Sequence, residues 1–177
     1  MGKTREYIYV FIISLIVLLL FACTNTSSQT CHTAKELMEK SIEAINNKSS
    51  KAYVSLVDFD SVIGILENAA KKDLSYKEDV EMFKSNRNIL IKGYSSSYNM
   101  LIGSLTRVYK LESWHFELEK YELESTEQEP GFTTENYIMK LKDENNNKWT
   151  MRIYIAKYNG CYYITEPIEA NYLSKGW

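Results

Sequence analysis

The side chains that most often perform chemistry are sparse in this chain, and the clearest pair of them is His115 and Glu117. The chain contains only two histidines and three cysteines. His115 and Glu117 are two residues apart, which places both on one face of an extended strand. A histidine beside a carboxylate could act as a general acid and base. The charged neighbours Glu119 and Lys120 favour the simpler interpretation, a strand edge that faces solvent.

No group of residues has the spacing of a metal site. His32 lies in a polar stretch, where we expect it to be exposed, and no pair of cysteines has the spacing of a zinc site. Four glutamates form an acidic strip, which we interpret as a solvated edge that discourages aggregation between strands: Glu122, Glu124, Glu127 and Glu129. We therefore predict no metal ion and no cofactor, and we assign no catalytic residue.

Residues 1–22 have the layout of an export signal. Lys3 and Arg5 supply a positive start, and the run from Tyr7 to Leu20 is almost free of polar side chains, with Ser14 as its one interruption. The run is shorter than the roughly 20 apolar residues that a transmembrane helix needs. An uncleaved membrane helix and a plain signal peptide without lipid remain the alternatives.

The apolar run ends in the tetrapeptide Leu-Phe-Ala-Cys at residues 20–23. This tetrapeptide resembles the lipobox of bacterial lipoproteins, in which an aliphatic, a variable and a small residue precede a cysteine. The resemblance implies that Cys23 is lipidated and becomes the new N-terminus after cleavage behind Ala22. Several acyl chains on one cysteine would anchor the protein firmly. We then expect a domain on the extracytoplasmic side of a bacterial outer or plasma membrane, joined to it by a flexible tether over residues 23–32.

Two further cysteines, Cys31 and Cys161, would remain after lipidation. An oxidising compartment permits a disulfide between them, and the long loop that it would close favours it. The sequence does not show whether their Cα atoms lie close enough. The alternative is two independent residues, with Cys161 as a small strand hydrophobe and Cys31 as a thiol on the solvent side.

The charge of the chain excludes one class of partner. The formal net charge is −2, and the signal segment contributes +1 through Lys3, Arg5 and Glu6, which leaves −3 for residues 23–177. Binding to nucleic acid depends on a clustered basic face, which a mildly acidic domain with a single adjacent lysine pair lacks. We predict no nucleic-acid partner.

Apolar periodicity predicts one α+β domain over residues 33–177. Thr33 and Glu36 have the spacing of a helix capping box. Helical periodicity then continues to about residue 105, with a bend expected near Gly93 and residues 95–97. Alternating patterns and turn signals, among them Pro130-Gly131 and Asn159-Gly160, predict an antiparallel sheet that follows the helices. The predicted helices cover 34–45, 50–57, 61–72 and 76–105, and the predicted strands cover 114–124, 136–142, 149–155 and 161–165.

Two short stretches resemble the nuclear transport factor 2-like superfamily. Residues 44–53 resemble the family's first helix end, polar turn and second helix, and residues 148–149 with 159–164 resemble its last two strands. The resemblance covers Thr33 to Pro167. It implies a cone-like fold, with N-terminal helices packed on a curved antiparallel sheet of about four strands. Catalytic members of the family use an Asp or a His inside the cone, and no motif here matches either residue.

Four aromatic residues could line an apolar pocket in such a cone: Tyr94, Tyr98, Trp149 and Tyr163. The alternative is that they fill the core. We predict a non-enzymatic lipoprotein of the cell envelope that binds a small apolar molecule, a glycan or another envelope protein. An enzyme that uses the cone's cavity and an immunity-type lipoprotein that binds a toxin are the alternative functions.

Overall fold

The computed structural model of the chain describes residues 31–168 and 173–176. The predictions for the signal segment, for lipidated Cys23 and for residues 24–30 of the tether lie outside this part. The described residues all belong to one compact unit, which begins at Cys31. Within the described residues, no helix combines the length and apolar character needed to cross a bilayer.

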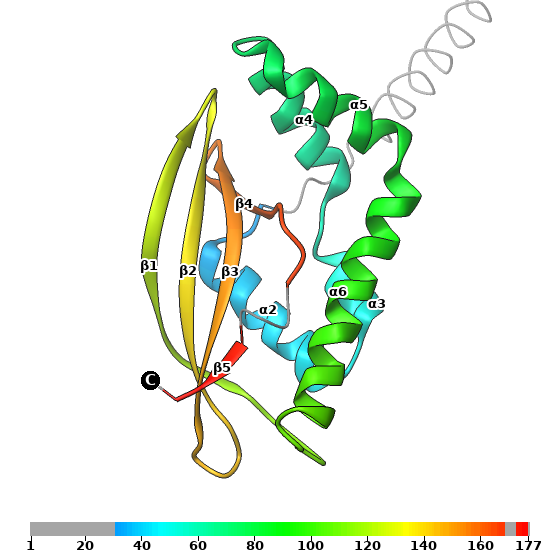
Figure 1. Cartoon of the computed structure of the whole chain (residues 1–177). Helices are drawn as coiled ribbons and strands as arrows, with labels where there is room; N and C mark the ends of the chain where they lie inside the picture. The colour runs from blue at the N-terminus through cyan, green and yellow to red at the C-terminus, as the bar shows by residue number, and fades with distance from the viewer. Residues whose placement is uncertain (1–30, 169–172, 177) are drawn as a thin grey trace, which may run out of the picture. The chain divides into compact units, whose positions relative to one another are not determined.

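Helices occupy the first half of the described unit and strands the second half (Figure 1). The unit is therefore α+β with segregated elements, as the sequence predicts. The helices are α2 (Ala34–Asn46), α3 (Ser50–Ser55), α4 (Phe59–Ala70), the 3₁₀ turn η1 (Leu74–Tyr76), α5 (Lys77–Ser85) and α6 (Arg87–Arg107). The strands are β1 (Glu117–Glu129), β2 (Phe132–Lys142), β3 (Lys148–Tyr158), β4 (Cys161–Ile164) and β5 (Leu173–Lys175).

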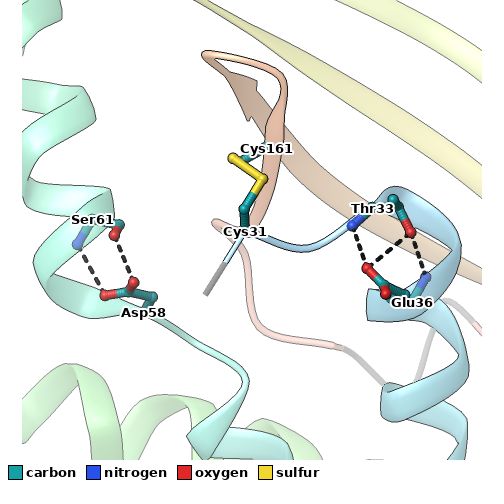
Figure 2. The surroundings of a disulfide bond; sticks show 6 residues. All are labelled: Cys31, Thr33, Glu36, Asp58, Ser61 and Cys161. Carbon is teal, nitrogen blue, oxygen red and sulfur yellow. Dashed lines mark hydrogen bonds between the residues drawn. A yellow bond between two sulfur atoms is a disulfide. The ribbon is translucent and has the colours of Figure 1, made fainter. Parts of the chain in front are cut away.

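Short polar side chains fix where the first helices begin. The capping box at α2 is confirmed, because Thr33 accepts from the Glu36 amide while the Glu36 carboxylate accepts from the Thr33 amide (Figure 2). At α4, the Asp58 side chain accepts hydrogen bonds from both the amide and the hydroxyl of Ser61. Each cap satisfies amides that have no partner within the helix.

The long helical stretch breaks at a different place from the one predicted. Asn86 leaves helical geometry, with φ −117° and ψ 21°, and separates α5 from α6. Gly93, where we expected the bend, lies inside α6, and a Cβ built on it would meet nothing within 4 Å. The polar residues after it are accommodated because α6 buries only one face, through Tyr94, Tyr98, Leu101 and Leu105.

The strands form one curved antiparallel sheet in the order β1-β2-β3-β4, and the short β5 pairs with β3. Two tight turns set the register. Gly131, at φ 102°, turns β1 into β2, and Asn159 and Gly160, at φ 50° and 81°, join β3 to β4. Two consecutive residues of positive φ are the geometry of a type I′ hairpin turn. The curved sheet of four to five strands agrees with the predicted fold class.

The first strand is shifted from its predicted range. It begins at Glu117 rather than Trp114 and runs on to Glu129. Trp114 and Phe116 lie before it, yet both are buried. The side chain of Asn46 holds this segment, donating to the Phe116 carbonyl (2.9 Å) and accepting from the Phe116 amide (2.8 Å). The alternating pattern therefore identified the buried positions but not the backbone that presents them.

The sheet has apolar side chains against it on both faces. Consecutive residues of a strand point to opposite faces of the sheet. In β3, Ile155 belongs to the main apolar core, and its neighbour Ala156 belongs to a second apolar cluster. The main core packs β2 and β3 against α2 and α6. The second cluster packs the start of β2, the end of β3 and β4 against α4. Its buried residues are Val62, Ile65, Ala69, Phe132, Ala156 and Tyr163.

The turn between β2 and β3 is organised by the buried carboxylate of Asp143. It accepts from the amides of Asn145 (2.9 Å) and Asn147 (2.8 Å) and from the Trp149 indole (3.0 Å). Burial alone would raise the pKa of this carboxyl, but the hydrogen bonds from Asn147, Trp149 and Asn145 outweigh it and lower the pKa below its usual value.

Asp143→Asn is therefore expected to lower the free energy of unfolding by about 1–3 kcal/mol, since an amide group cannot accept all of these hydrogen bonds. Because the folded pKa is depressed, the stabilisation by Asp143 is present above the carboxyl's unfolded pKa, near 4, and is lost as the pH falls through the folded value. Urea unfolding at pH 7 and at pH 3 measures both effects. A difference between variant and wild type that did not shrink at pH 3 would contradict this account.

Candidate functional site

A disulfide joins the start of the described unit to its fourth strand. Cys31 and Cys161 are bonded, with their Cα atoms 5.0 Å apart (Figure 2). The next residue, His32, forms a bridge with Tyr162, whose amide donates to the His32 carbonyl (3.0 Å). The N-terminal segment thus lies beside β4 before α2 begins at Ala34. Of the two arrangements that the sequence left open, the structure has the bonded one.

The four aromatic residues proposed for a pocket lie in the packed interior instead. Tyr94, Tyr98, Trp149 and Tyr163 are each at most 4% exposed. Tyr94 donates to the Thr165 carbonyl, and Tyr98 donates to the Ala44 carbonyl, both at 2.6 Å. Their hydroxyls therefore have partners without any water-filled cavity. Tyr98 thus connects α6 to α2, and Tyr94 connects α6 to the segment after β4. All four aromatic side chains fill the core rather than line an opening.

Burial also keeps Tyr94 and Tyr98 neutral. Desolvation raises the pKa of Tyr98 to about 12, and it raises the pKa of Tyr94 still further. Both phenols thus remain hydrogen-bond donors throughout the physiological pH range. This is the protonation state that their contacts with backbone carbonyls require.

The two histidines lie apart from each other. His115 and Glu117 border an open hollow of 480 Å³ at the end of α2, together with Glu39 and Glu43. His32 is half-buried rather than exposed, and desolvation and the neighbouring Lys40 lower its pKa. Among the described residues, no group of three or more His, Cys, Asp or Glu side chains is placed to hold a metal ion.

The acidic strip on β1 is more tied to its surroundings than a solvated edge would be. Glu124 accepts two hydrogen bonds from Arg152 and one from Asn136, and Glu122 pairs with Lys120 and Lys140 at 3.0 Å. Hydrogen bonds from these partners lower the pKa of both carboxyls. Glu122 and Glu124 therefore link β1 to β2 and β3.

A second hollow lies where α4, η1 and α5 meet the turn between β1 and β2, and we call it the hairpin hollow. Its volume is 370 Å³, which is within the range of small-molecule sites. Val62, Ile65 and Phe132 contribute a buried apolar wall. The remaining lining residues are Leu66, Tyr76, Asp79, Phe83, Glu129, Thr134, Thr165 and Glu166.

The polar rim of the hairpin hollow centres on Tyr76. Its hydroxyl donates to the Glu129 carboxylate, and its ring meets Phe132 edge to face, with ring centroids 6.2 Å apart. Desolvation raises the pKa of Tyr76 to about 12, with further contributions from Glu129, Asp73 and Asp79. Tyr76 is therefore a neutral donor in a negative environment.

Sequence reasoning did not find the hairpin hollow, because its walls come from segments that lie far apart in the chain. Phe132, Thr134 and Glu129 flank the predicted Pro130-Gly131 turn, but nothing in their order indicates that α4 packs against them. The one available signal was the apolar face of α4, whose Val62 and Ile65 lie at helical spacing.

The chain was compared with protein-family models, with curated proteins and with solved structures, and none of the three comparisons gave a match.

Proposed function

We propose that this chain is an exported lipoprotein, held on a bacterial membrane through Cys23, whose domain binds a small molecule in the hairpin hollow. The observation that supports export is the bond between Cys31 and Cys161. Disulfides persist in extracytoplasmic compartments and are rare in the cytosol, where thiol reductants keep cysteines reduced. Cys31 also follows the predicted lipidation residue by only eight positions.

The binding role is supported by the hairpin hollow. Its volume, its apolar wall and its few polar groups are the features that small-molecule sites share. We make no assignment of a catalytic residue. The superfamily resemblance and its cone remain a hypothesis beside this proposal.

The anchoring is tested by metabolic labelling with a clickable fatty acid in a bacterial host. We expect the wild-type chain to carry the label and to sediment with membranes, and Cys23→Ala to lose the label. Cys31→Ala is the matched control, because it removes a cysteine outside the lipobox and should keep the label. Equal labelling of wild type and Cys23→Ala would overturn the lipid anchor.

A further inference from the structure

The hairpin hollow combines an apolar interior with acidic groups at its opening. Val62, Ile65 and Phe132 are at most 9% exposed. Glu129 is half-buried, and Asp79 is exposed at the rim. No lysine, arginine or histidine is among the described residues that line the hollow. A ligand that enters it therefore meets apolar surface and negative charge together.

Aromatic rings add a second attraction for a cation. Tyr76 and Phe132 meet at an interplanar angle of 82°, and Phe83 lines the same hollow. A cation within about 6 Å of a ring centroid is attracted by the ring's negative face. A basic group does lie close by, since Lys72 Nζ is 3.1 Å from the point where a Cβ on Gly131 would stand. Lys72 is beside the turn and outside the lining, and it offsets only part of the rim's charge.

We propose that the hairpin hollow binds small organic cations that carry an apolar body, with the cationic group beside Asp79, Glu129 and Tyr76 and the apolar body against Val62, Ile65 and Phe132. This inference deepens the proposed small-molecule function and rests on it. The neutral Tyr76 hydroxyl holds the Glu129 carboxylate in place, so the acceptor is oriented before the cation arrives.

Three probes with the same apolar body, a phenylbutyl group, separate the charge from the hydrophobic contribution: 4-phenylbutylammonium, 4-phenylbutanol and 5-phenylpentanoate. The full chain is kept in a non-ionic maltoside detergent, and binding is titrated by saturation-transfer NMR at pH 7 and low salt, with empty micelles as the blank. We expect the ammonium to bind with a dissociation constant in the low millimolar range. The alcohol should bind about tenfold more weakly, and the carboxylate should not bind.

Variants then locate the site. Glu129→Gln removes the charge and keeps an oxygen acceptor for the Tyr76 hydroxyl. Asp79→Asn removes the negative charge of Asp79 at the rim. Each should weaken binding of the ammonium about fivefold and leave the alcohol unchanged. Glu119→Gln is the matched control, since it removes the same charge from β1 outside the lining. Leu66→Trp, which fills the hollow, should abolish binding of both the ammonium and the alcohol.

The outcomes separate this inference from the proposed function. Equal binding of the ammonium and the alcohol, abolished by Leu66→Trp, would overturn the cation preference and leave a small-molecule site. Ammonium binding weakened as much by Glu119→Gln as by Glu129→Gln would also overturn it, because the effect would then follow overall charge. Binding that survives Leu66→Trp, or binding of none of the three probes, would overturn the hollow as a site.

Discussion

Removal of the Cys31–Cys161 disulfide is expected to lower the free energy of unfolding by about 2–5 kcal/mol. The two cysteines are 130 residues apart, so the bond closes most of the domain into one loop. The chain-entropy model gives about 5 kcal/mol for a loop of this length, at the upper end of observed values. Urea unfolding of Cys161→Ser against wild type, under oxidising conditions, measures the difference.

Two controls isolate the bond from its side chains. Wild type treated with a thiol reductant should unfold at the same urea concentration as Cys161→Ser, and the double variant Cys31→Ser/Cys161→Ser should not be less stable than Cys161→Ser alone. A reduced wild type that is as stable as the oxidised form would show that the loop closure contributes nothing.

Truncation of Trp149 is expected to have a comparable effect. Trp149 is fully buried, and its ring meets Tyr109 and Phe116 edge to face, with ring centroids 5.0 and 5.6 Å away. Trp149→Ala should cost about 3–5 kcal/mol, through lost contacts and the cavity left behind. The same change also removes the indole donor from Asp143. Thermal or urea unfolding measures the loss.

Trp149→Phe separates packing from hydrogen bonding. It retains most of the apolar surface and should cost less than Trp149→Ala. Because Trp149 and Asp143 are partners, the effect of Trp149→Phe should be smaller when Asp143 is already Asn. Additive effects of the two substitutions would show that the indole–carboxylate hydrogen bond does not contribute to stability.

The sequence predicted those parts of the fold that local rules determine. The capping box at Thr33, the glycine turns at residues 131 and 160, and the alternating strand β3 each depend on neighbours within a few residues. The break at Asn86 and the late start of β1 were missed. The late start of β1 depends on a contact between distant segments, the pair of hydrogen bonds between Asn46 and Phe116. The strand β5 is only three residues long, too short for a periodic signal.

The same limit explains what was missed at the site. Tyr94 and Trp149 were identified as notable, but a sequence does not distinguish an aromatic residue that lines a cavity from one that fills the core. A buried aromatic residue with a polar group needs a hydrogen-bond acceptor nearby, and that acceptor can come from a distant part of the chain. The Thr165 carbonyl accepts from Tyr94, and the Asp143 carboxylate accepts from Trp149. The hairpin hollow depends on the packing of α4 against the start of β2 and the end of β3, which is a contact between segments that lie far apart in the sequence.

The position of the disulfide also decides how the domain would respond to mechanical load. When an oxidised molecule is stretched between its two ends, the disulfide carries the force past all residues between Cys31 and Cys161. Only residues outside this loop, before Cys31 and after Cys161, can then be extended. Reduction would release a further 130 residues, about 450 Å of extended polypeptide. A tension experiment would therefore record a short extension from the oxidised protein and a long one from the reduced protein.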